Sequence, residues 1–302
     1  MAESGAPPWW PHAARSRWVE SGGLRWHVQH WPADPGSPVA LLLHGTGAAT
    51  HTWRHVAPLL SAQGFNVIAP DLPGHAFTLT PAQHTLTLSA VAQSVGALLG
   101  PLRVRPDLVI GHSAGAAIAL RMVLDGLIAP ALTVSINGAL LPPHGPLGRL
   151  FLPLARMLTV NPLVPSVFAA WAARPSVARR LLDSTGSRID NDGERAYAHL
   201  VANAGHAAGA LRLMASWDLQ PLAATLPGWR APLLLLAAQG DRTVPAAQAQ
   251  RVHQLVGAAS QCVLLPRGGH LVHEEDAAAV LAPVLAAWVQ AAPGVARVAF
   301  GA

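Results

Sequence analysis

Short apolar runs separated by longer amphipathic stretches dominate the chain from residue 39 onward. The runs span 39–43, 65–69, 108–110, 132–136, 232–238 and 261–265. Runs of this kind are typical of parallel strands that helices cover on both faces. Stretches suited to helices follow or separate them at 54–62, 86–99, 116–120, 246–255 and 274–289. The alternation predicts an α/β fold, with a mostly parallel twisted sheet between two layers of helices.

The N-terminal region has a different pattern. Residues 16–20 and 24–30 alternate in polarity and are joined by Ser21-Gly22-Gly23, which predicts a β-hairpin. Residues 1–15 show no periodic pattern of hydrophobic and polar positions. We predict that they form a tail, with Trp9 and Trp10 available to anchor it to a surface.

The strand pattern stops between about residues 141 and 230, where repeated prolines break a series of helical stretches. We predict an inserted helical cap at 141–228 on a core made of 16–140 and 229–302. Residues 150–173 are strongly apolar, but three prolines, Asn161 and Arg156 interrupt them. A membrane span is therefore not predicted. The stretch is expected either to line an apolar pocket or to rest on a membrane surface.

Composition excludes several classes of partner. Hydrophobic residues make up 51% of the 302 residues, charged residues only 12%, and the net charge is +5. All 20 basic residues are arginine, and apart from Arg179-Arg180 they are scattered, so nucleic acid is not an expected partner. Cys262 is the only cysteine, which excludes a disulfide framework and a cysteine zinc site. No histidine spacing indicates a metal site, and no cofactor is predicted. The first residues lack the pattern of a signal peptide, so we predict a cytoplasmic protein.

The candidate chemistry centres on Gly111-His112-Ser113-Ala114-Gly115, which follows the run 108–110 and opens a helical stretch. A G-x-S-x-G sequence between a strand and a helix is the pattern of a nucleophile elbow, with the serine at the apex of the turn. Glycine is needed on either side because the strand and helix pack too closely for a side chain. The alternative is a buried serine that caps an ordinary helix.

Asp241 and His270 also follow predicted strands, so both are expected at the same edge of the sheet as Ser113. The chain order serine, aspartate, histidine is that of hydrolases with this elbow. His270 would take the serine proton, and Asp241 would orient the imidazole and stabilise its charged form. Asp71 is an alternative acid, but it precedes the serine in a turn-like Asp-Leu-Pro-Gly sequence, so we interpret it as structural.

A tetrahedral oxyanion requires hydrogen-bond donors that are already in place. The backbone amides of Ala114 and Thr46 are the candidates, while His44 and Gly47 are expected to shape the turn that carries Thr46. Trp53 in the loop that follows is a candidate substrate-binding residue.

The motifs at 44–47, 71–75, 111–115, 240–241 and 269–270 together resemble the α/β-hydrolase superfamily over nearly the whole chain. More narrowly, the chain is similar to the magnesium chelatase accessory proteins of bacteriochlorophyll biosynthesis. The stretches that carry this similarity are 16–20, 23–29, 111–117, 135–140, 161–165, 185–188 and 216–219. Dehalogenation, another reaction of this fold, needs a carboxylate nucleophile where this chain has Ser113.

The resemblance implies a role in magnesium insertion into protoporphyrin or in handling its product, with chelatase subunits as partners and a location in the cytoplasm or at the surface of the photosynthetic membrane. A porphyrin is a flat apolar disc with carboxylate tails. Aromatic and sulfur side chains for its face would be Met157, Phe168, Trp171 and Trp217, and candidate cations are Arg156, Arg179, Arg180 and Arg188. The same residues would also suit a cap that packs its own core.

Two functions stay open: an esterase-like serine hydrolase for a hydrophobic substrate, and a porphyrin-binding or chelatase-assisting protein that keeps the triad without turnover.

Overall fold

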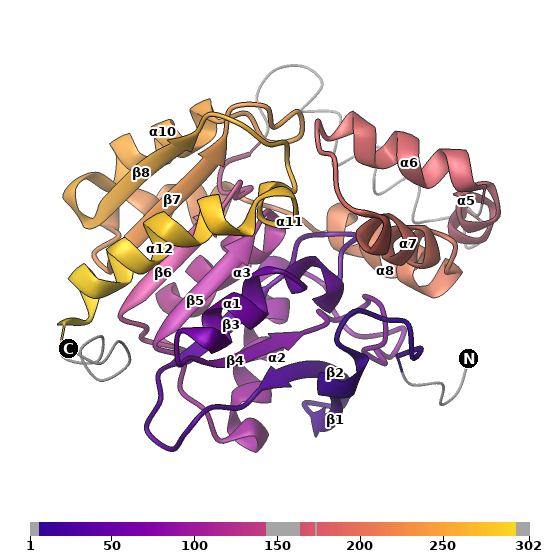
Figure 1. The fold of residues 1–302 in the computed structure, drawn as a ribbon, viewed down its shortest axis with the longest axis horizontal. Helices are drawn as coiled ribbons and strands as arrows, with labels where there is room; N and C mark the ends of the chain where they lie inside the picture. Colours follow the sequence, from indigo (N-terminus) through magenta and orange to yellow (C-terminus); the bar gives the residue numbers. More distant parts are fainter. Residues whose placement is uncertain (1–5, 143–163, 173, 294–302) are drawn as a thin grey trace.

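An eight-stranded sheet forms the centre of the computed structural model, which describes residues 6–142, 164–172 and 174–293 (Figure 1). The strands are β1 Ser16–Ser21, β2 Leu24–Trp31, β3 Val39–Leu43, β4 Asn66–Pro70, β5 Leu108–His112, β6 Leu132–Ile136, β7 Leu233–Ala238 and β8 Ser260–Leu265. Their order is β1-β2-β4-β3-β5-β6-β7-β8. Strands β1 and β2 form the predicted hairpin and β2 pairs antiparallel with β4, while every later pairing is parallel. The predicted α/β fold is confirmed.

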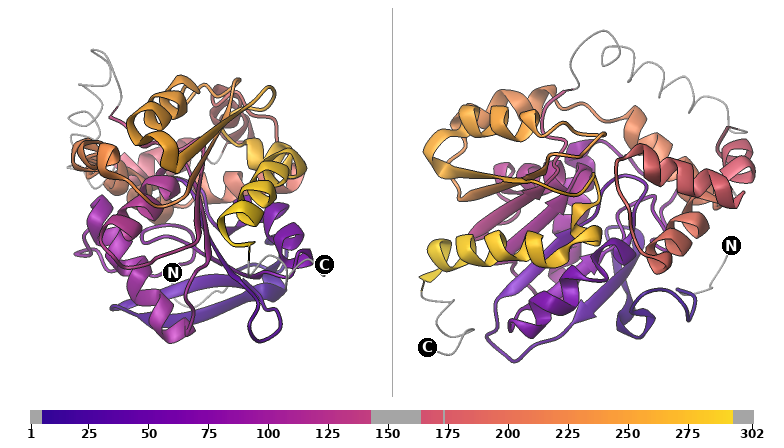
Figure 2. Two further views of the ribbon diagram at one scale, coloured as in Figure 1. Left: turned by 90° about the vertical axis from the view of Figure 1, so that its left-hand side faces the viewer. Right: turned by 45° about the horizontal axis from the view of Figure 1, so that its top comes forward.

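Helices cover both faces of this sheet (Figure 2). The helices of the core are α1 Val56–Ala62, α2 Leu88–Leu102, α3 Ala114–Leu124, α10 Ala247–Val256, α11 Val272–Glu275 and α12 Ala277–Ala291. Helices α2, α3 and α10 pack in one apolar cluster with the sheet, and α1 and α12 pack in the other. Short 3-10 helices lie at Ala13–Arg15, Thr50–Trp53, Leu226–Gly228 and Gly257–Ala259.

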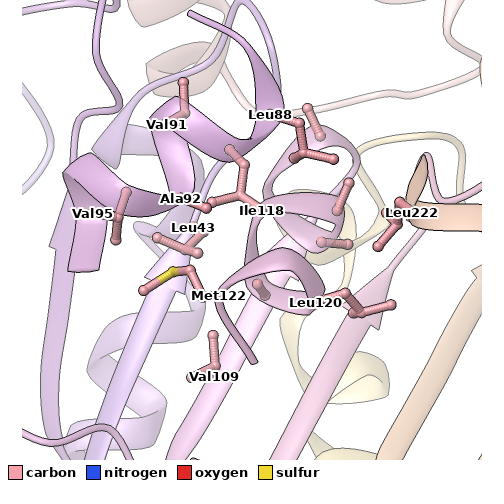
Figure 3. Packing of buried hydrophobic residues seen from close by; sticks show 14 of the residues in the cluster. Leu43, Leu88, Val91, Ala92, Val95, Val109, Ile118, Leu120, Met122 and Leu222 are labelled. Atoms are coloured by element: carbon pink, nitrogen blue, oxygen red, sulfur yellow. The ribbon is translucent and has the colours of Figure 1, made fainter. Parts of the chain in front are cut away.

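The unbroken apolar runs are explained by alternation across the sheet. In β3, Leu41 and Leu43 face the α2 and α3 side, whereas Ala40 and Leu42 face the α1 and α12 side. All four are at most 1% exposed, because successive side chains of a strand point to opposite faces and both faces are covered. Figure 3 shows Leu43 packed among side chains of α2 and α3.

The last helical stretch, predicted as one helix over 274–289, is instead two helices. Asp276 separates them, and its side chain accepts the N–H of Ala279 as the N-cap of α12. An aspartate with non-helical backbone angles at this position starts a new helix. Glu274 therefore does not belong to the first turn of α12. It lies in the short α11 and is buried against Arg54.

The described part of the predicted cap is helical. Its helices are α5 Val164–Ala172, α6 Pro175–Ser184, α7 Asn191–Val201, α8 Ala204–Ala215 and α9 Gln220–Thr225. Helices α5 to α8 lie together beyond the carboxyl ends of the parallel strands (Figure 1). Leu222 and Leu226 instead belong to the apolar cluster of α2 and α3, so the end of the predicted cap packs against the sheet.

The predicted N-terminal tail is held against the rest of the chain from residue 6. Trp10 is 1% exposed and packs with Ala49 of the core and with Ala196 and Leu200 of α7. Its indole N–H donates to the hydroxyl of Thr50. Trp10 thus anchors the N-terminal segment, as expected, and it does so by packing between the core and a cap helix.

Candidate active site

Ser113 occupies the sharp turn between β5 and α3. Its backbone angles are φ 51° and ψ −115°, a conformation that costs energy for any residue other than glycine. A side chain at Gly111 would approach the N atom of Ala116 to 2.4 Å, and one at Gly115 would approach the carbonyl oxygen of Leu43 to 2.0 Å. The strained turn therefore depends on glycine at both flanks, as the motif requires.

The imidazole of His270 pairs with the carboxylate of Asp241. Nδ1 of His270 lies 2.8 Å from Oδ2 of Asp241, and both residues are buried, with 7% of His270 and 8% of Asp241 exposed. The other carboxylate oxygen accepts the backbone N–H groups of Thr243 and Val244 at 2.7 and 2.9 Å. These bonds fix the carboxylate so that it accepts the Nδ1 proton, which leaves Nε2 of His270 free to act as a base.

Ser113 and His270 line one cavity of about 750 Å³. Thr46 and Ala114, whose amides are the predicted oxyanion donors, line it too. The opposite wall comes from α8 and includes Ala207, Ala210, Leu211 and Met214. The structure thus brings the predicted nucleophile, the predicted base and both predicted oxyanion donors to one apolar cavity between the sheet and the cap.

The sequence pattern of the alpha/beta hydrolase family matches residues 40–283. The chain belongs to this family. It is 39% identical over 271 residues to the "Magnesium-chelatase 30 kDa subunit" of Rhodobacter capsulatus, which covers 89% of this chain and 92% of that protein.

Solved structures of the family have the same fold. An alpha/beta hydrolase fold protein from Burkholderia ambifaria superposes with a TM-score of 0.74 at 24% identity, over 89% of this chain and 97% of that one. The epoxide hydrolase CorEH superposes with a TM-score of 0.76 at 20% identity, over 91% and 98%. At these identities the superpositions establish the fold of this chain and do not establish a reaction.

The aromatic and sulfur residues predicted to contact substrate fall in different places. Phe168 and Trp217 line the cavity. Trp171 lies on the outer side of α5, 45% exposed, with its ring 5.8 Å from that of Phe168. Trp53 is fully buried among α1, α12 and the sheet, which corrects the prediction that it contacts substrate. Met157 lies outside the described residues.

The predicted arginine anchors do not line the cavity where the structure describes them. Arg179 forms an ion pair with Glu194 on the surface, and Arg180 donates to Ser176. Arg188 is exposed, and Arg156 lies outside the described residues. Within the described part of the chain, the lining of the cavity contains no arginine.

His206 on α8 also lines the cavity, a role that the sequence did not indicate. Its Nδ1 accepts the N–H of Ala76 at 3.0 Å, and Nε2 lies 3.2 Å from the carbonyl oxygen of Gly47. Burial lowers the pKa of His206 to about 4, so the ring is neutral at pH 7. It connects the cap to the turn that carries Thr46.

The alternative acid Asp71 is used in the core. Its carboxylate lies 2.7 Å from Nδ1 of His27 and accepts the N–H of Thr50 at 2.7 Å. Burial opposes ionisation, but these partners hold the pKa of Asp71 at about 2. Asp71 therefore organises the turns next to the site, as the structural interpretation expected.

A second buried polar group lies between α7 and the core. The carboxylate of Glu274 accepts from Arg54, from the hydroxyl of Tyr197 and from the hydroxyl of Thr52. Burial raises the pKa of Glu274 against the opposing effect of Arg54. Since Tyr197 belongs to α7, this group fixes one cap helix to the core.

The described residues hold no group of three or more histidine, cysteine, aspartate or glutamate side chains arranged for a metal ion. None of the described helices is both long enough and apolar enough to cross a bilayer.

Proposed function

We propose that this protein cleaves an ester or similar acyl bond of a hydrophobic substrate, with Ser113 as nucleophile, His270 as base and Asp241 as its orienting acid. The observation that carries the proposal is that Ser113 and the Asp241-paired imidazole line the same apolar cavity. A serine hydroxyl needs such a base because it is a weak nucleophile at neutral pH.

In the proposed reaction, Oγ of Ser113 attacks the acyl carbon while Nε2 of His270 takes the hydroxyl proton. The backbone N–H groups of Thr46 and Ala114 stabilise the oxyanion, and loss of one such donor typically costs about 3 kcal/mol of transition-state stabilisation. His270 then gives its proton to the departing alkoxide, which leaves as an alcohol. Water, activated by the same imidazole, releases the acid from the acyl-enzyme and restores Ser113.

The lining of the cavity favours an apolar and uncharged part of the substrate. Its larger apolar side chains include Phe168, Met214 and Trp217, and its polar side chains include Ser113, His206 and His270. A bound carboxylate would lack an arginine partner among the described lining residues, so we expect charged tails to remain outside the cavity.

The test is reaction with a fluorophosphonate probe that labels activated serines. Wild-type protein is expected to be labelled and Ser113→Ala is not, whereas Ser184→Ala, which alters an exposed cap serine, should be labelled like the wild type. Asp241→Asn should slow labelling on the order of 10³-fold or more, because the imidazole loses its orientation. No labelling of folded wild-type protein would refute the hydrolase proposal.

The second candidate is binding of a porphyrin, or of the chelatase, without turnover. The 39% identity to the magnesium-chelatase subunit of Rhodobacter capsulatus favours it. On this proposal the protein works in bacteriochlorophyll biosynthesis, in the cytoplasm or at the surface of the photosynthetic membrane.

Two measurements separate the candidates. A shift of the porphyrin absorption spectrum on titration, together with faster magnesium insertion by the chelatase, would support the binding role. Restoration of pigment synthesis by Ser113→Ala in a phototrophic bacterium lacking this protein would favour binding, and failure of a folded Ser113→Ala protein to restore it would favour catalysis.

A further inference from the structure

Three segments far apart in the chain meet behind the Asp241–His270 pair. They are residues 185–187 of the cap, the acid turn at 239–242 and the histidine turn at 267–271. Their glycines are in direct backbone contact. A side chain on Gly186 would come within 2.4 Å of the carbonyl oxygen of Gly240, and one on Gly269 within 2.3 Å of the carbonyl carbon of Gly186.

Hydrogen bonds join the cap segment to both turns. The carbonyl oxygen of Thr185 accepts the N–H of Arg242 and the N–H of His270, each at 3.2 Å. The hydroxyl of Ser187 accepts the N–H of Leu271 at 2.8 Å, and Ser187 is only 2% exposed. One short segment of the cap thus binds the residue after the acid, the histidine itself and the residue after the histidine.

We propose that residues 185–187 are a positioning element that sets His270 relative to Asp241, with Ser187 as a positioning residue. The proposal rests on the proposed hydrolase function, since it assigns a task within that site. Its physical basis is that the two turns share Thr185 as an acceptor while Ser187 holds the far side of the histidine turn. Loss of the Ser187 hydroxyl leaves the buried N–H of Leu271 without its acceptor, so the histidine turn can move relative to the acid.

A segment that only attached the cap would behave differently. Its loss would lower stability, but the hydrogen bond between the two catalytic side chains would keep its geometry. The hydrogen bond itself is therefore the useful readout. A proton shared between an imidazole and a carboxylate gives a far-downfield proton resonance, because the hydrogen bond is short and charge-assisted.

The test is proton NMR of the full chain combined with ester hydrolysis. Asp241→Asn identifies the His270 Nδ1 resonance by removing it. The His27–Asp71 pair, with a nitrogen–oxygen distance of 2.7 Å, supplies an internal reference away from the cap segment. In Ser187→Ala we expect the His270 resonance to shift or broaden while the His27 resonance stays, and kcat to fall about tenfold or more with KM changed less than twofold.

Matched variants control the interpretation. Ser184→Ala removes an exposed hydroxyl one turn earlier, which donates to the carbonyl oxygen of Leu181, and should change neither resonance. Ser187→Cys keeps the side-chain shape with a weaker acceptor and should give an intermediate effect. It is also the variant to use if Ser187→Ala does not fold.

An unchanged His270 resonance and unchanged kcat in folded Ser187→Ala or Ser187→Cys would overturn the proposal. If the wild type hydrolyses no ester while Ser187→Ala still changes the His270 resonance, this result would support the positioning element and refute the hydrolase function. NMR therefore tests the positioning element, and the kinetics test the hydrolase function.

Discussion

The side-chain amide of Asn137 donates a hydrogen bond to the backbone carbonyl oxygen of His270 at 2.9 Å. It also donates to the carbonyl oxygen of Gly269 at 3.0 Å and accepts the N–H of Ala238 at 2.8 Å. Asn137 follows β6 and has a positive φ of 46°, which asparagine tolerates better than most residues. One buried amide thus ties the end of β7 to the histidine turn.

We expect Asn137→Ala to weaken both the fold and the site. The substitution leaves three buried backbone groups without this partner, which should cost about 2–4 kcal/mol of unfolding free energy. The rate of fluorophosphonate labelling should fall at least tenfold because the histidine turn loses a support. Urea unfolding and labelling kinetics measure the two effects. Asn191→Ala, at the exposed start of α7, is the control. Labelling of Asn137→Ala at the wild-type rate would contradict the role of Asn137 in supporting the histidine turn.

Two helical glycines should respond to alanine with opposite signs. A side chain at Gly209 of α8 would lie 1.7 Å from the carbonyl oxygen of Gly74, whereas one at Gly96 of α2 would come no closer than 3.4 Å to its nearest neighbour, the side chain of Leu127. Gly96→Ala should therefore stabilise the protein by up to about 1 kcal/mol through helix propensity. Gly209→Ala should destabilise it by about 2 kcal/mol or more, because α8 must move away from the core.

Thermal or urea unfolding of the two variants checks this contrast. Because α8 forms one wall of the cavity, Gly209→Ala should also alter ester hydrolysis, while Gly96→Ala should not. Stabilisation by both substitutions would mean that α8 does not sit tightly on the turn at Gly74.

The parts of this chain that follow local rules were predictable from the sequence. Apolar runs gave the strands because both faces of the sheet are covered, and turn motifs put Ser113, Asp241 and His270 at one edge. Residues that act through distant contacts were not. Asn137 holds a turn more than 130 positions away, and His206 reaches from the cap to the carbonyl of Gly47.

Aromatic residues illustrate the same limit. Trp53 and Phe168 are both apolar and lie outside the strand pattern, yet one is in the core and the other lines the cavity. The difference arises from which face of a short helix meets the core, and composition does not encode it. The apolar pattern over 274–289 is continuous and predicts one helix. The side chain of Asp276 nevertheless caps a new helix through its hydrogen bond with the N–H of Ala279, and hydrophobic periodicity does not reveal such a cap.

Trp53 and Phe168 should separate stability from substrate binding. Trp53→Ala is expected to cost about 3–5 kcal/mol of unfolding free energy because it empties a fully buried site. Phe168→Ala should change the unfolding free energy by less than about 1 kcal/mol and lower kcat/KM for long-chain esters about tenfold, through lost apolar contact. Hydrolysis of a short acetyl ester by Phe168→Ala is the control. An equal loss for short and long esters would exclude chain recognition by Phe168.

Acid should unfold this protein through its buried histidines, and His206 provides the clearest test. Burial lowers the pKa of His206 to about 4, while in the unfolded chain a histidine titrates near 6.5. Between these values the unfolded state binds the extra proton. The contribution of His206 to stability is therefore complete above pH 6.5 and is lost as the pH falls toward 4, by up to about 1.4 kcal/mol per pH unit and about 3 kcal/mol in total.

His206→Gln replaces the ring with a side chain that does not titrate. Urea unfolding at pH 7.5, 6.0 and 5.0 should give a shallower loss of stability for this variant than for the wild type. Equal slopes would place the acid sensitivity in the other fully buried histidines whose pKa burial lowers, which are His44, His51, His75, His112 and His273.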